Sequence, residues 1–220
     1  MINLRNLGLA VVASAACSCA LAVQVVPSAY AMPNGNAGDY TYFDESYNGS
    51  GCVTCAGAAL SGGLGDLTNG VIATTSWNVA EPPAGPGPYV GWRFVNPAIT
   101  FSFAGVVNID SVTISFDSNA ITGVFAPQSV TIAGQTFPIT APAQAGPFSA
   151  TFNNLGFVGS SLPISITRNG VWVFASEVQF QATAVPEPGT AALLLAGGLL
   201  AAGIARRRLA HARFSNLAAP

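Results

Sequence analysis

From about Val71 onward, hydrophobic and polar residues alternate along the chain with a period of two. This alternation is typical of β-strands that turn one face to a core, and most of the apolar positions are β-branched or aromatic. Gly, Pro, Asn and Asp separate the runs, as turns require. The pattern shows no long helical period and predicts an all-β fold, an antiparallel sandwich of the jelly-roll type. The clearest runs are Ile99–Phe103, Val112–Phe116, Val130–Ile132, Phe148–Phe152, Ile164–Ile166 and Val178–Phe180.

The N-terminus has the features of an export signal. Arg5 is followed by an apolar stretch from Leu7 to Val26, and Ala29-x-Ala31 then satisfies the small-residue rule of signal peptidase. We therefore expect a signal peptide over residues 1–31 and a mature chain that begins at Met32. An uncleaved N-terminal anchor is the alternative.

The C-terminus has three features in a fixed order. Pro186, Glu187 and Pro188 come first, an apolar run from Ala191 to Ala205 follows, and three arginines close it at 206–208. A helix of about 16 residues would be roughly 24 Å long, short for the ~30 Å hydrocarbon layer but able to span a locally thinned one. The arginines would stay on the cytoplasmic side, which places the preceding chain outside.

This tail resembles the PEP-CTERM sorting signal of Gram-negative bacteria that make exopolysaccharide. The resemblance implies that an exosortase recognises Pro186, Glu187 and Pro188 and processes the segment 185–208. It also implies an inner-membrane-anchored precursor whose product reaches the cell surface or the extracellular matrix. The chain departs from the family in its extension over residues 209–220, expected to be a cytoplasmic tail. An ordinary short membrane anchor is the alternative.

Residues 32–184 are about 150 residues, which is enough for one domain with its own core. Their only basic residues are Arg93 and Arg168, set against eight acidic residues, so the domain carries a net charge of −6. The whole chain lacks lysine. Binding to a phosphate backbone depends on Lys and Arg, so nucleic acid is excluded as a partner, whereas Ca²⁺ prefers oxygen ligands and is compatible with this charge.

Cys52 and Cys55 form a Cys-Val-Thr-Cys motif in a glycine-rich stretch. A four-ligand zinc site would need a second pair of ligands, and the one histidine, His211, lies beyond the anchor. A redox site of the thioredoxin type would need a βαβ context, which the pattern lacks. The sequence favours a small disulfide loop formed in an oxidising compartment.

Several landmarks follow one another in an order that resembles the discoidin family, the coagulation-factor C-type, galactose-binding-like jelly roll. They are the glycine-rich loop Gly62–Gly70, then Trp77, a middle strand Pro127–Ile132 and a closing strand Val171–Phe180. The resemblance covers about residues 58–182 and implies a non-catalytic binding domain. A generic secreted β-sandwich is the alternative.

The resemblance implies a calcium site at Asp66, Asn69 and Glu177, because the family's early loop and last strand supply oxygen ligands. The alternative is that Asp66 and Asn69 only form a turn and that Glu177 is a solvated strand residue.

The resemblance also places ligands at loops at one end of the sandwich. Trp77, Tyr89 and Trp92 are candidates for stacking on sugar rings, with Arg93 donating to hydroxyl or carboxylate oxygens. The alternative is that the tryptophans are core residues. Trp172, in the closing strand, is expected to pack in the core.

Residues 32–184 contain no histidine and no lysine, which removes the usual bases of nucleophilic catalysis. A pair of carboxylates is the only catalytic scheme left open, so we expect no enzyme. The leading hypothesis is an exported protein that binds extracellular polysaccharide in a biofilm or matrix, with or without calcium. The alternative is a structural matrix protein that binds itself, since only 7% of its residues are charged.

Overall fold

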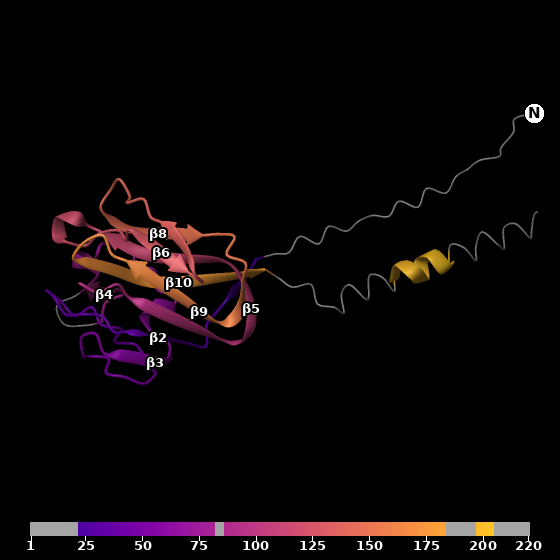
Figure 1. Cartoon of the computed structure of the whole chain (residues 1–220), viewed down its shortest axis with the longest axis horizontal. Coiled ribbons are helices and arrows are strands. Elements are labelled where there is room, and N and C mark those ends of the chain that lie inside the picture. The colour runs from indigo at the N-terminus through magenta and orange to yellow at the C-terminus, as the bar shows by residue number, and fades with distance from the viewer. Residues whose placement is uncertain (1–21, 82–85, 184–196, 205–220) are drawn as a thin grey trace, which may run out of the picture. The chain divides into compact units, whose positions relative to one another are not determined.

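The computed structural model describes residues 22–81, 86–183 and 197–204 (Figure 1). Residues 22–183 form one compact unit, and a short helix over 197–204 lies outside it. Within the described ranges, no helix is long and apolar enough to cross a membrane. Residues 1–21 of the expected signal peptide, residues 82–85, the Pro-Glu-Pro motif, the rest of the expected anchor and the tail 209–220 fall outside these ranges.

The compact unit is a single antiparallel sheet, which confirms the all-β prediction. Its central path runs in the order β1-β10-β5-β9-β6-β7, and β2, β3, β4 and β8 pair beside that path. The strands are β1 (Ala22–Val25), β2 (Ala29–Pro33), β3 (Ala59–Gly63), β4 (Val90–Arg93), β5 (Ala98–Ser118), β6 (Ser129–Ile132), β7 (Gln135–Pro138), β8 (Gly146–Phe152), β9 (Phe157–Thr167) and β10 (Trp172–Thr183). The helical turns are η1 (Asp66–Thr68), α1 (Trp77–Ala80) and η2 (Ala120–Thr122).

Two of the predicted strands are one strand in the structure. β5 runs for 21 residues, and its first half pairs with β2 and β9 while its second half pairs with β8 and β10. The pairing with β9 shifts register between Ser102 and Val107, next to Gly105, so that the strand bends there and continues. Because β5 changes neighbours along its length, it joins the two halves of the sheet around one core.

That core has two parts. The larger contains the inward side chains of β5, β9 and β10, among them Phe101, Ile114 and Phe180. The smaller lies at the end of the sheet where β10 begins, and we call it the aromatic cluster. Its members are Tyr42, Trp77, Tyr89 and Phe174, with Tyr40 and Trp172 packed against them.

The sheet begins ten residues before Met32, the expected start of the mature domain. β1 pairs with the end of β10, and Ala29, Tyr30 and Ala31 pair with β5. Tyr30 is only 1% exposed. The folded unit therefore includes ten residues that the sequence assigned to the signal peptide.

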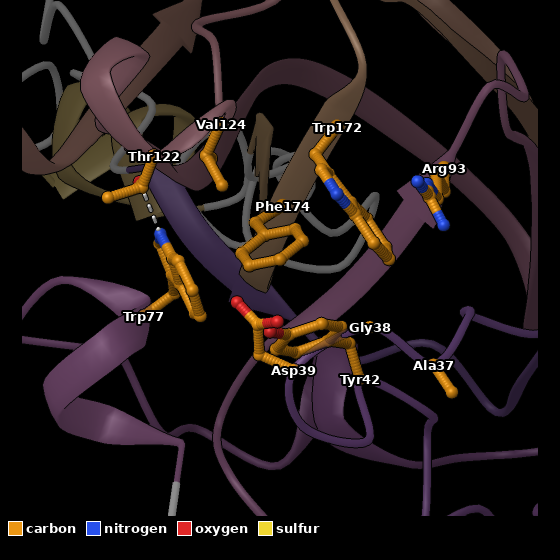
Figure 2. Close-up of a pocket in the computed structure, with 10 residues that line it drawn as sticks. All are labelled: Ala37, Gly38, Asp39, Tyr42, Trp77, Arg93, Thr122, Val124, Trp172 and Phe174. Carbon is orange, nitrogen blue, oxygen red and sulfur yellow. Dashed lines mark hydrogen bonds between the residues drawn. The ribbon is translucent and has the colours of Figure 1, made fainter.

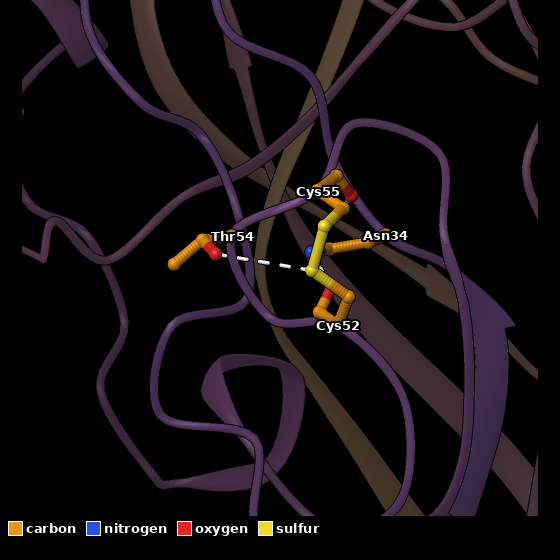
Figure 3. The surroundings of a disulfide bond; sticks show 4 residues. All are labelled: Asn34, Cys52, Thr54 and Cys55. Carbon is orange, nitrogen blue, oxygen red and sulfur yellow. Dashed lines mark hydrogen bonds between the residues drawn. A yellow bond between two sulfur atoms is a disulfide. The ribbon is translucent and has the colours of Figure 1, made fainter.

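The stretch between β2 and β3 is irregular but closely tied to the sheet. Asn34 organises it: the side-chain amide donates to the carbonyl oxygens of Cys52 and Cys55, and its oxygen accepts from the backbone of Asp44. The two cysteines form a disulfide whose Cα atoms are 5.3 Å apart (Figure 3). Tyr42, also in this stretch, is buried without belonging to a strand.

Candidate ligand-binding site

A pocket of about 330 Å³ opens over the aromatic cluster (Figure 2). Five segments that are distant in the sequence build it: the loop after β2, the start of α1, the end of β4, the turn around η2 and the start of β10. Its lining consists of Ala37, Gly38, Asp39, Tyr42, Trp77, Arg93, Thr122, Val124, Trp172 and Phe174.

Four aromatic residues line the pocket: Tyr42, Trp77, Trp172 and Phe174. Tyr42 lies at its centre, with ring centroids 4.7 Å from Phe174, 5.2 Å from Trp172 and 5.7 Å from Trp77. Four of the five ring contacts that join Tyr42, Trp77, Trp172 and Phe174 are edge-to-face, which suits the quadrupoles of the rings and fixes their orientation. These contacts hold the rings in fixed positions, and of the four rings only that of Trp172 is half-buried, the others being buried beneath it.

The start of α1 fixes Trp77 in this wall. The buried carboxylate of Asp117 accepts hydrogen bonds from the Ser76 hydroxyl at 2.8 Å and from the Trp77 backbone at 2.9 Å. The Trp77 indole N–H donates to the Thr122 hydroxyl oxygen at 2.9 Å. Both ends of the residue are thus held, so that its ring has no freedom to swing out of the pocket.

Two charged side chains add polar chemistry at the rim. Arg93 is exposed, and its guanidinium lies over the rings of Phe94 and Trp172, 5.0 and 5.7 Å from their centroids. Trp172 and Arg93 are also direct cross-strand partners in β10 and β4. The exposed carboxylate of Asp39 lines another part of the pocket. The pocket thus offers one strong donor and one strong acceptor beside apolar faces.

Of the four residues expected to contact a sugar, the structure places Trp77 and Arg93 in the pocket wall. Tyr89 and Trp92 are fully buried and present no surface to a ligand. Their polar atoms hold the backbone instead: the Tyr89 hydroxyl donates to the Thr75 carbonyl, and the Trp92 indole donates to the Pro33 carbonyl. The core alternative, which was given for the tryptophans, describes Trp92; Tyr89 is a core residue as well, and Trp77, only 6% exposed, is buried although it lines the pocket.

Trp172 differs from its expected role as a core residue. It is half-buried and lines the pocket beside Arg93. Its place in the sequence could have predicted this role. Trp172 is the first residue of β10, and a residue at the end of a strand lies where the loops meet. No sequence pattern marks Asp39 or Tyr42 as a pocket residue, since both lie in an irregular loop.

The three residues of the expected calcium site are brought together at a different place, where η1 packs against β10. Asn69 donates to a carboxylate oxygen of Asp66 at 3.2 Å, and the Gly70 backbone donates to Glu177 at 3.1 Å. Both carboxyl groups are buried. We call this arrangement the η1 clasp.

The η1 clasp is not arranged as a calcium cage. One oxygen of Asp66 is buried and lacks a hydrogen-bond partner, as a metal ligand would. The amide nitrogen of Asn69 nevertheless points at Asp66, its oxygen accepts from the Val71 backbone, and Glu177 already accepts from Gly70. Among the described residues, no three His, Cys, Asp or Glu side chains are placed to hold a metal ion. As arranged, the clasp does not fit calcium.

A thermal-shift measurement tests whether the η1 clasp binds calcium. A site with a Kd of about 10 μM would add about 2.7 kcal/mol at 1 mM calcium and raise the Tm by several degrees. From the clasp geometry we expect millimolar calcium at pH 8, compared with chelator, to leave the Tm unchanged. A rise of several degrees that Glu177→Gln abolishes would show that the clasp rearranges into a calcium site.

Burial also changes the acidity of carboxyl groups in this half of the molecule. It raises the pKa of Asp66 to about 6, although the hydrogen bond from Ser46 acts in the opposite direction. It raises the pKa of Glu177 and of Glu81 to about 7, partly offset by hydrogen bonds from the backbones of Gly70 and Tyr89. These groups titrate close to neutral pH.

Residues 184–208 match the PEP-CTERM protein-sorting motif. This match implies a protein that is exported, anchored in a membrane before processing, and processed by an exosortase. No curated protein matches the chain.

Among solved structures, the chain is similar to a fucose-binding-type lectin (F-lectin) from striped bass serum, with 16% identity over 55% of this chain and 41% of the lectin and a TM-score of 0.38. It is also similar to the family 32 carbohydrate-binding module of Clostridium perfringens NanJ in complex with galactose, with 8% identity over 53% and 82% of the two chains and a TM-score of 0.34. A third is a family 32 module bound to GalNAc, with 14% identity, 64% and 93% coverage and a TM-score of 0.32. The chain spans less than half of the striped bass lectin.

Proposed function

We propose that this exported protein binds extracellular polysaccharide without catalysis and that the pocket over the aromatic cluster is its binding site. The observation that carries the proposal is the pocket wall, in which the half-buried ring of Trp172, backed by buried aromatic rings, stands beside one guanidinium and one carboxylate. Sugar rings have apolar C–H faces and hydroxyl edges, so this combination suits them. The pocket volume lies at the small end of ligand sites, which favours one or two sugar units.

The charge of the domain favours a neutral sugar. Residues 32–184 carry a net charge of −6, which repels a polyanionic chain at low ionic strength. Arg93 donates to hydroxyl oxygens and Asp39 accepts from hydroxyl groups, so a neutral hexose satisfies both. We therefore expect neutral exopolysaccharides to bind more tightly than polyuronates of the same length.

The pocket lining supports binding without hydrolysis. Asp39 is the only carboxylate among the residues that line it. Glycoside hydrolysis in its common form needs two carboxyl groups on either side of the scissile bond, and a single exposed one does not supply that pair.

Replacing Trp172 with alanine is expected to weaken glycan binding at least tenfold, because the ring forms an open face of the pocket and also orients Arg93. Truncation of a binding-site aromatic commonly costs more than 1 kcal/mol. Isothermal titration with a panel of neutral exopolysaccharide fragments measures the change. Val158→Ala is a matched control, since Val158 is 67% exposed and does not line the pocket.

Unchanged affinity in Trp172→Ala, with the Val158→Ala control intact, would show that sugar binds elsewhere. Failure of the native chain to bind any glycan would contradict the proposal itself. The second candidate, a self-associating matrix protein, would then be preferred, because its surface carries few charges and several exposed apolar side chains such as Val106 and Ile121. Sedimentation over a concentration series would reveal that self-association.

A further inference from the structure

The ten residues before Met32 are built into the sheet and its core. β1 forms four residue pairs with the end of β10. Three of them involve Val23, Gln24 and Val25, which follow Ala22. The Ser28 backbone N–H donates to the Ser102 carbonyl at 2.7 Å, one residue before β2 begins to pair with β5. These segments are therefore strands of the domain.

Tyr30 is the residue on which the core depends most in this segment. Its ring packs 5.1 Å from Tyr47 and 5.6 Å from Phe101, measured between centroids. Its hydroxyl donates to the buried carboxylate of Asp44, and its carbonyl accepts from the Tyr47 hydroxyl. A chain cut after Ala31 would lose this ring and leave Asp44 buried without that donor, so the product would be missing part of its core.

A second processing site fits the sequence better. Ala20-Leu21-Ala22 has small residues at the same two positions as Ala29-Tyr30-Ala31. The apolar residues that precede it, Leu7 to Cys19, number 13, within the 7–15 residues of a signal-peptide core. Cleavage after Ala31 would instead leave an apolar stretch of 20 residues from Leu7 to Val26, which is longer than such a core. Ala20 and Leu21 lie outside the described residues.

We propose that signal peptidase cleaves this chain after Ala22, so that the mature protein begins at Val23. The two candidate products differ by the nine residues Val23–Ala31. Signal peptidase acts on the chain before it folds, so the fold does not shield either bond. Only the longer product can complete the sheet, because it retains three of the four residues of β1 and the whole of β2.

The experiment is to export the full chain in a Gram-negative host and determine its N-terminus by intact mass and by sequencing the labelled N-terminal peptide. We expect a single N-terminus at Val23. An N-terminus at Met32, or a chain that retains residues 1–22, would overturn the proposal.

Two matched substitutions test which bond is cleaved, and the rate of precursor processing is measured for each. Ala22→Leu places a large residue at the proposed cleavage position and is expected to slow conversion of precursor to product at least tenfold in a pulse-chase experiment. Ala31→Leu makes the same change at the other site and is expected to leave conversion unchanged. Slowed conversion in Ala31→Leu with normal conversion in Ala22→Leu would show that cleavage occurs after Ala31.

Discussion

Replacing Asp44 with alanine is expected to lower the free energy of unfolding by about 3–5 kcal/mol, the largest effect of any single polar residue in the domain. Asp44 is fully buried and holds three segments together. One oxygen accepts from the Tyr30 hydroxyl, and the other accepts from the Asp66 backbone at 2.8 Å. Alanine leaves both donors buried and unpaired, at about 1–3 kcal/mol each, and adds a cavity.

Asp44→Asn is the matched control. Burial raises the pKa of Asp44, which means that the surroundings disfavour its charge. Asparagine keeps the shape and an acceptor oxygen without a charge, so we expect it to cost less than half as much as alanine. Gly65 packs so closely against Asp44 that a Cβ atom at position 65 would collide with the carboxyl group. Larger side chains at either position are therefore expected to destabilise the fold.

Denaturant unfolding of the native chain, Asp44→Ala, Asp44→Asn and Tyr30→Phe measures these costs. Tyr30→Phe removes one donor and keeps the ring, so its cost should fall between those of the other two variants. Equal stability of Asp44→Ala and the native chain would show that the domain folds without this hydrogen-bonded junction. It would also weaken the argument that Tyr30 belongs to the mature protein.

Most of the sheet could be predicted from the alternation of side chains. The runs around Phe101 and Phe180 are strands with one buried and one more exposed face, and the run around Ile114 is a strand whose end is buried on both faces. Alternation does not show how the chain runs between two predicted strands. The sequence therefore did not predict that β5 continues through its register shift. β1 and β2 were missed for another reason: their apolar residues continue the hydrophobic stretch of the export signal, and composition does not separate the two.

The candidate site was harder to predict than the fold. Trp77, Trp92 and Trp172 are one residue type in similar surroundings, and sequence does not reveal which of them turns a face to solvent. Trp92 is buried because its indole reaches the Pro33 carbonyl, a contact between residues 59 positions apart. Asp44 was also missed as a structural residue, since its partners lie 14 and 22 positions away and no local motif marks them.

The domain is expected to lose stability as the pH rises from about 5 to 8. In the unfolded chain, aspartate and glutamate side chains release their protons near pH 4. In the native state, burial raises the pKa of Asp66 to about 6 and that of Glu81 and Glu177 to about 7. Between these values the native state binds more protons than the unfolded chain, so the free energy of unfolding falls with rising pH.

The stabilisation is therefore complete below about pH 4 and is lost as the pH passes through the native pKa values. Because the three carboxyl groups are buried, the combined loss should be on the order of 4 kcal/mol, and Asp44 shifts in the same direction. Urea unfolding at pH 5 and pH 8 measures it. A free energy of unfolding that rises between these pH values would contradict the expectation.

Glu177→Gln separates this effect from general charge repulsion. Glutamine stays neutral and still accepts from the Gly70 backbone, so the variant should exceed the native chain in stability at pH 8 and match it at pH 5. Asp110→Asn removes one negative charge from an exposed position and is the control. If both variants flatten the pH dependence equally, the loss of stability comes from the net charge of the domain, and burial of Glu177 in the η1 clasp is not its cause.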